Sequence, residues 1–231
     1  MAFKLRTYDM RHNDPTGRGP NGPPDPRAFD GKKTVIIHGK RVTEASPRSR
    51  WPHAELWGVT RCNVIFWHES LRDWTRWFDV HPVESTDYHR GIKAKRPEAW
   101  AWYQRQECTR PIYLLEAHPD IPASVAFPLD AVLQHFGWTR ETSRFTVSVD
   151  LMIGLAICEG FERIVLNGIG TRFEPDFQFA HQGILYWLGQ VEGRGLDLVI
   201  EGDSCYRPSG KVYGYDTGAP DWVKTPALAG V

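Results

Sequence analysis

The stretch SVDLMIGLAICEGFERIVLNGIG, residues 148–170, decides the fold class of this chain. After Ser148 its first half is apolar nearly all round, which is typical of a helix buried on most faces. Gly160 marks the end of that helix, and the aliphatic run behind it is typical of a buried strand. A buried helix that leads into a buried strand indicates a βαβ crossover, so the stretch predicts a parallel sheet.

The same alternation continues on both sides of this stretch. Residues 179–195 place apolar side chains on one helical face, and LDLVIEG, residues 196–202, is a further expected strand. A short helix closed by glycine is expected over residues 127–137. Four more short strands are expected, at residues 34–37, 55–60, 74–82 and 112–116. Together the elements predict one Rossmann-like α/β three-layer sandwich with a mostly parallel sheet of about six strands.

The Rossmann-like domain is expected to cover residues 32–203. Residues 1–31 are rich in Pro, Gly, Asp and Arg, and such a segment buries too little apolar surface to offset its ordering entropy. We therefore expect an extended or disordered arm, with an arm that wraps a neighbouring subunit of a homo-oligomer as the alternative. Residues 204–231 are expected to form an irregular C-terminal cover.

Composition argues against several classes of function. The 28 Lys and Arg residues balance 28 Asp and Glu residues, whereas a dedicated nucleic-acid binder normally has a strong positive excess. The four cysteines form no CxxC pair, so their spacing indicates neither a structural zinc site nor a disulfide scaffold. The chain shows no apolar leader and no apolar run long enough to span a bilayer, and the cytoplasm is the expected location.

Polar and cationic residues follow most of the expected strands. Ligands of open parallel sheets bind beyond the carboxyl ends of the strands, near the point where the strand order reverses. The candidate nucleotide-binding residues at these ends are His38, Gly39, Lys40, Arg41, Thr60, Arg61, Gly168 and Glu174. Ser148 joins them, because a helix N-terminus attracts anions, although simple capping is its alternative role. The sequence has neither a GxxxxGK[ST] loop nor a GxGxxG loop after the first strand.

Two histidines are the candidate general acid or base residues. Imidazole side chains are suited to proton transfer near neutral pH, and His81 and His118 each follow an expected strand. Asp79 stands two residues before His81, so in a strand both side chains would share one face. That pair indicates either a polar surface edge or a pocket at the carboxyl end of the sheet. Glu116 and Asp120 add carboxylates near His118, which leaves a divalent-metal site open as an alternative without a recognised ligand spacing.

A resemblance to a known family rests on five stretches taken together: ELWGVT, WFDVHP, HPDIPASVAFPLD, FTVSVDLMIGLAICEGFERIVLNGIG and YWLGQVEGRG. The chain resembles a group of bacteriophage-encoded Rossmann-like proteins, most of them uncharacterised, over about residues 34–202. More distantly it is similar to 6-hydroxymethylpterin diphosphokinase-like proteins, to motility accessory factors and to bacterial sialyltransferases. The resemblance implies that a nucleotide, or a nucleotide-activated donor, binds at the strand ends.

The family's site positions fall on residues of this chain that the strand-end argument also selects. They are Gly39 and Lys40 in the first loop, Thr60 on the second strand, Asp79 and His81 facing the cleft, Ser148 at the helix opening and the acidic Glu174. Two positions depart from the family pattern. The first loop is HGKRVTEAS in place of a GxGPS-type loop, and Thr60 replaces an asparagine.

Three functions follow from these observations. The first is a transferase that uses a nucleotide-activated donor such as a nucleotide sugar, for instance a phage glycosyltransferase-like enzyme in the host cytoplasm acting on modified bases in DNA. Lys40, Arg41 and Ser148 would hold the phosphates, and His81 or His118 would act as base. The second is a nucleotide diphosphokinase or phosphotransferase that needs a divalent metal. The third is a non-catalytic protein that sequesters a nucleotide, which the unusual first loop favours.

Overall fold

The computed structural model describes seven segments of the chain: residues 30–39, 50–59, 74–84, 91–105, 109–170, 178–202 and 204–208. Five of the candidate binding residues lie outside the described residues: Lys40, Arg41, Thr60, Arg61 and Glu174. The expected arm, residues 1–31, and the expected cover, residues 204–231, also lie largely outside them.

The described residues form one sheet of seven strands, and all neighbouring strands run parallel. The strands are β1 (Thr34–His38), β2 (Glu55–Val59), β3 (Arg76–Phe78), β4 (Ile112–Leu114), β5 (Ser124–Ala126), β6 (Arg163–Asn167) and β7 (Asp197–Glu201). The spatial order is β5-β4-β3-β2-β1-β6-β7, so it reverses once, between β1 and β6. The expected Rossmann-like α/β fold is confirmed, and its switch point lies between β1 and β6.

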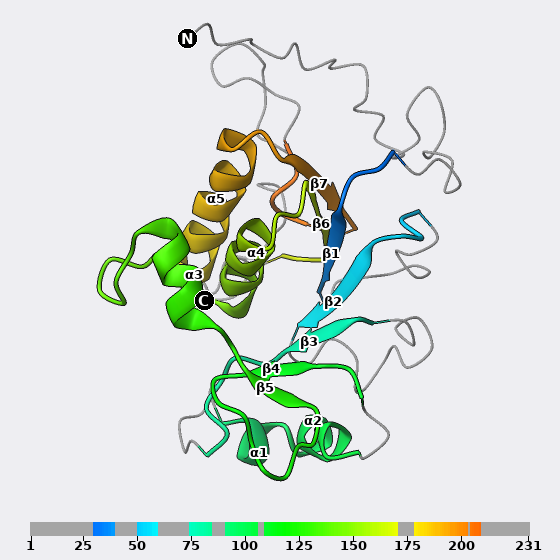
Figure 1. Cartoon of the computed structure of the whole chain (residues 1–231), viewed down its shortest axis with the longest axis vertical. Coiled ribbons are helices and arrows are strands. Elements are labelled where there is room, and N and C mark those ends of the chain that lie inside the picture. The colour runs from blue at the N-terminus through cyan, green and yellow to red at the C-terminus, as the bar shows by residue number, and fades with distance from the viewer. Residues whose placement is uncertain are drawn as a thin grey trace, which may run out of the picture.

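Helices cover the sheet, as Figure 1 shows. They are α1 (Ile92–Lys95), α2 (Pro97–Tyr103), α3 (Leu129–Phe136), α4 (Ser148–Cys158) and α5 (Gln178–Gly193). The three longest, α3, α4 and α5, lie together on one side of the sheet, whereas α1 and α2 lie near the end formed by β4 and β5. None of the described helices is long and apolar enough to cross a membrane.

Two strands differ most from the sequence-based expectation, and β4 also ends two residues early, at Leu114. The additional strand is β5, whose three residues lie between Pro122 and Pro128 and pair with β4. The strand expected over residues 74–82 ends at Phe78. There the His81 amide donates to the Asp79 carbonyl at 2.8 Å, which turns the chain over three residues. Asp79 and His81 are therefore brought together by this turn rather than by strand alternation.

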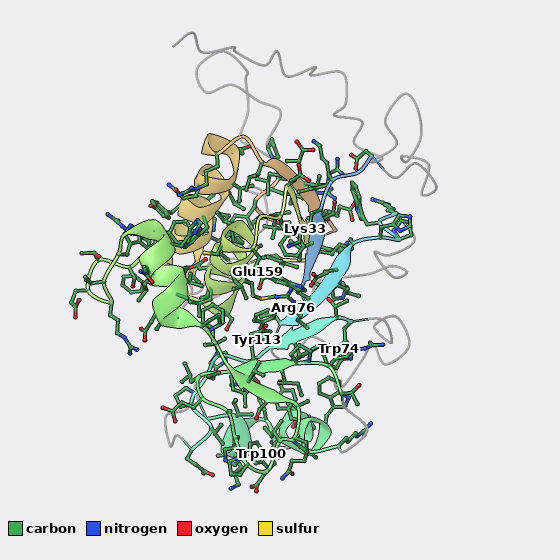
Figure 2. All side chains as sticks on the ribbon, in the orientation of Figure 1. Lys33, Trp74, Arg76, Trp100, Tyr113 and Glu159 are labelled. Atoms are coloured by element: carbon green, nitrogen blue, oxygen red, sulfur yellow. The ribbon has the colours of Figure 1, made fainter. Side chains whose placement is uncertain are left out.

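Helix α4 runs antiparallel to the strands, and hydrogen bonds hold its C-terminal end at their amino ends. Arg76, the first residue of β3, donates to the Glu159 carboxylate at 2.6 Å, and Lys33 donates to the Glu159 carbonyl at 2.7 Å. Figure 2 shows Arg76 and Glu159 close together in this region. The N-terminal end of α4 therefore lies at the carboxyl edge of the sheet, where ligands of this fold bind.

Gly58 makes room for the indole of Trp77 on the neighbouring strand. The two residues are register partners in the β2–β3 pair, and a Cβ atom at Gly58 would lie 2.1 Å from Cζ3 of Trp77. Trp77 is fully buried and its ring packs against Trp74 and Trp102 at centroid distances of 5.8 and 5.1 Å. Displacing the indole would therefore disturb an aromatic cluster under α2.

Replacement of Gly58 by alanine is expected to destabilise the protein by about 1–3 kcal/mol, the usual cost of overpacking a core. Gly189→Ala is the matched control, because a Cβ atom at Gly189 within α5 meets no atom within 4 Å. Alanine is the better helix former, so this variant should gain up to about 1 kcal/mol. Urea denaturation measures both free energies of unfolding. A Gly58→Ala variant as stable as Gly189→Ala would contradict the account of this packing.

Candidate functional site

The carboxylate of Asp79, directly after β3, is the centre of a buried hydrogen-bond network. Its Oδ1 atom accepts from His81 Nδ1 at 2.6 Å and from Arg96 Nη1 at 2.8 Å, and its Oδ2 atom accepts from the Tyr103 hydroxyl at 2.8 Å. Asp79 is fully buried, and Arg96 is 4% exposed and supplies the opposite charge. Burial, together with the nearby Asp79 carboxylate, raises the pKa of Tyr103, so this hydroxyl remains a donor.

His81 lies at the outer end of this network, and its side chain is 28% exposed. An ionised carboxylate only accepts hydrogen bonds, so the bond to Asp79 places the proton of the neutral imidazole on Nδ1. The other nitrogen, Nε2, is then left with a free lone pair. A histidine oriented in this way by a buried carboxylate is suited to accept a proton from a substrate.

His118 is held differently, in the loop between β4 and β5. Its Nδ1 atom accepts from the Asp120 amide at 3.1 Å, so the neutral ring carries its proton on Nε2. Its backbone amide donates to the Ser124 hydroxyl at 2.8 Å, and that hydroxyl donates back to the His118 carbonyl at 3.1 Å. The ring also contacts Trp100 edge-on. This arrangement organises a turn and leaves His118 a proton donor, whereas His81 is arranged as an acceptor.

Three polar side chains stand next to one another where β1, β6 and β7 end. His38, Asn167 and Glu201 are register partners across these strands, and each is at most 8% exposed. Asn167 Nδ2 donates to Glu201 Oε2 at 3.2 Å. Burial lowers the pKa of His38 to about 4, so the ring is neutral at physiological pH. We call this set of three residues the strand-end row.

Arg50 and Trp51, which precede β2, contact the strand-end row at Glu201. Glu201 Oε1 accepts from Arg50 Nη1 and from the Trp51 indole, both at 3.2 Å. The Trp51 ring in turn lies under the guanidinium of Arg163, at 4.9 Å. Glu201 therefore holds Arg50 and Trp51 against the sheet beside the switch point.

The backbones that leave β1 and β6 approach closely at two glycines, Gly39 and Gly168. The Gly39 amide donates to the Asn167 carbonyl at 2.8 Å, which extends the strand pairing by one residue. A Cβ atom at Gly39 would lie 2.5 Å from the Gly168 carbonyl oxygen, so this position requires glycine. Gly168 itself has a φ of 63°, which also favours glycine. Both candidate residues thus lie at the switch point.

The N-terminus of α4 is capped by Asp150 rather than by Ser148. The N-cap position is Val147, and Ser148 is the first helical residue. Asp150 Oδ2 accepts from the Thr146 amide, the Thr146 hydroxyl and the Val147 amide at 2.9, 2.7 and 3.3 Å. The expectation that Ser148 is the N-cap is therefore wrong, because the Asp150 carboxylate, three residues after Val147, holds the amides of Thr146 and Val147 and the helix begins at Ser148. An anion at Ser148 would also lie close to this carboxylate.

Asp150 and His38 are expected to give the stability of the protein opposite dependences on pH. Burial raises the pKa of Asp150 from 3.8 to about 6. Its contribution to the free energy of unfolding is therefore full below pH 3.8 and is lost as pH rises through 6. Burial lowers the pKa of His38 from 6.5 to about 4, so its contribution is full above pH 6.5 and is lost as pH falls toward 4. Each effect amounts to about 3 kcal/mol, and in the native protein the two largely offset each other.

Single variants should separate the two effects. Between pH 4 and pH 7, the free energy of unfolding should fall in His38→Leu, where Asp150 acts alone, and should rise in Asp150→Asn, where His38 acts alone. The remaining titratable groups are common to both variants, so the difference between the two pH profiles is the quantity to measure by urea denaturation. Parallel profiles would show that these two groups do not titrate abnormally.

Several residues of the site have no signal of their own in the sequence. Arg96 and Tyr103 reach Asp79 from 17 and 24 residues away, and no linear spacing links them to it. Asn167 and Glu201 are different, because each ends a strand: the strand-end argument reaches Asn167 after β6, and its extension to β7 selects Glu201.

Within the described residues, no three or more His, Cys, Asp or Glu side chains gather closely enough to hold a metal ion. Comparison of the chain with family models, with curated proteins and with solved structures gave no match.

Proposed function

We propose that this protein is a transferase that binds a nucleotide-activated donor at the carboxyl edge of the sheet and uses His81 as general base. The observation that carries the proposal is the 2.6 Å hydrogen bond between Asp79 and His81, with the imidazole partly exposed at that edge. A buried aspartate that orients a histidine is the arrangement that activates a hydroxyl in many acyl and group transfer enzymes.

The spacing of the strands supports an extended ligand. His81 follows β3, which is separated from the switch point by β2 and β1. With neighbouring strands about 4.8 Å apart, the base lies roughly 10–14 Å from the switch point. A ligand that occupies both places must have a binding portion at one end and a reacting group at the other. A nucleotide sugar has this form, with the nucleotide at the switch point and the transferable sugar near His81.

The proposed chemistry is transfer to a hydroxyl acceptor. His81 Nε2 takes the proton of the acceptor hydroxyl while the hydroxyl oxygen forms a bond to the sugar carbon. The bond between that carbon and the phosphate oxygen breaks, and the nucleotide leaves with the electron pair. Asp79 stabilises the resulting imidazolium, and Arg96 balances the carboxylate charge before the proton arrives. A modified base in DNA is the acceptor that the family resemblance suggests.

A thermal-shift screen tests the proposal and identifies the donor class. The ligands are CMP, UDP, GDP, ATP and several nucleotide sugars, each with and without Mg²⁺ or Mn²⁺. A ligand at 100 times its Kd should stabilise the folded protein by about 2.7 kcal/mol. Stabilisation by a nucleotide sugar, followed by its turnover, is the expected result. Stabilisation by ATP only with metal would point instead to a phosphotransferase, and binding without turnover to a sequestering protein.

A further inference from the structure

Two buried polar atoms at the switch point have no hydrogen-bond partner within the described structure: His38 Nδ1 and Asn167 Oδ1. Their residues end the adjacent strands β1 and β6 as register partners and are 2% and 8% exposed. A buried polar atom without a partner costs about 1–3 kcal/mol, so a pair of them side by side indicates a place that another molecule completes.

Glu201 determines which way the Asn167 amide points. A carboxylate only accepts, so the amide nitrogen must face Glu201 Oε2, and the amide oxygen is left as an acceptor. Glu201 itself is already occupied, because Arg50 and Trp51 donate to its other oxygen. The strand-end row therefore offers one acceptor, Asn167 Oδ1, and one imidazole nitrogen, His38 Nδ1, which either donates or accepts.

A hydroxyl group matches this pair. The Cα atoms of neighbouring strands lie about 4.8 Å apart, so one oxygen atom placed between the two side chains can reach both. It would accept from His38 Nδ1–H and donate to Asn167 Oδ1. A phosphate does not match, because it needs donors or a cation, whereas here it would meet an amide oxygen with the Glu201 carboxylate next to it.

We propose that His38 and Asn167 bind a ribose hydroxyl of the nucleotide, and that its phosphates lie away from the strand-end row. The proposal rests on the function proposed above and assigns the part of the donor that the switch point recognises. Both atoms are beneath the protein surface, so the bound hydroxyl is enclosed and a ligand without it leaves them unpaired.

The test pairs ribonucleoside diphosphates with their 2′,3′-dideoxy analogues and measures Kd by calorimetry. For the nucleotide that binds the native protein, the dideoxy analogue should bind at least about tenfold more weakly. In His38→Leu and His38→Phe the difference between the two ligands should shrink to about twofold or less. Both variants replace an unpaired buried polar ring by an apolar group, so both should fold. Ile36→Leu is the control, a volume-conserving change on the same strand that should keep the full preference.

Three other outcomes would overturn the inference that His38 and Asn167 bind a ribose hydroxyl. Equal binding of both nucleotides by the native protein would mean that the strand-end row holds water only. A preference that persists in both His38 variants would mean that the hydroxyl is recognised elsewhere. Either result leaves the proposed transferase intact, because that proposal depends on His81. Failure of every nucleoside diphosphate and nucleotide sugar to bind would overturn both proposals together.

Discussion

Replacement of His81 by glutamine is expected to lower kcat for the donor identified by the screen by about 10²- to 10⁴-fold, the usual contribution of a general base. Glutamine retains an N–H group that can donate to Asp79, so the buried network and the fold should persist. The KM for the donor should change little, because the nucleotide binds at the switch point and the base acts only on the acceptor.

His118→Gln is the matched control for this experiment. Its imidazole accepts a hydrogen bond from the Asp120 amide and organises a turn, so its replacement should affect stability more than turnover. A large loss of kcat in His118→Gln together with normal turnover in His81→Gln would reverse the two roles. Normal turnover in both variants would refute general-base catalysis by either histidine, even if the donor binds.

Replacement of Asp79 by leucine is expected to destabilise the protein by about 3–5 kcal/mol. The variant leaves the Arg96 guanidinium, whose side chain is 5% exposed, without its carboxylate. An unpaired buried charge carries a cost of this size, and the Tyr103 hydroxyl loses its acceptor as well. The free energy of unfolding from urea denaturation measures the loss.

The double variant Asp79→Leu/Arg96→Leu is the decisive comparison. Since it removes both charges, it should be less destabilised than the sum of the two single variants by at least about 1 kcal/mol. Strict additivity would show that the two side chains do not interact in solution. A loss below about 1 kcal/mol in Asp79→Leu would show that the carboxylate is not buried and paired as described.

The fold was predictable because its signals are local and repeated. The apolar helix over 148–158 followed by the aliphatic strand over 163–167 predicts a parallel crossover without knowledge of the rest of the chain. Strand β5 was not predicted, because three residues between two prolines are too few to show an alternating pattern. They form a strand only through their pairing with β4. Long-range pairing of this kind is decided by tertiary contacts.

The candidate site was predictable only in part, for the same reason. Asp79 and His81 are two residues apart, so their pairing has a local signal, whereas Arg96 and Tyr103 are placed against Asp79 by the packing of α2. The Ser148 expectation failed because a serine before an apolar run is a normal capping signal, and the competing cap from Asp150 depends on the turn at Thr146. Ser148 and Asp150 are equally good capping residues by local sequence, so the tertiary structure determines which of them caps the helix.

The tautomers of the two histidines test the central claim most directly, without any ligand. Long-range ¹⁵N–¹H NMR of the imidazole rings distinguishes a proton on Nδ1 from one on Nε2, and the His81→Gln and His118→Gln variants assign the signals. The account predicts that neutral His81 carries its proton on Nδ1, toward Asp79, and that neutral His118 carries its proton on Nε2. A proton on Nε2 of His81 would mean that Asp79 does not orient it and that the proposed base has no free lone pair.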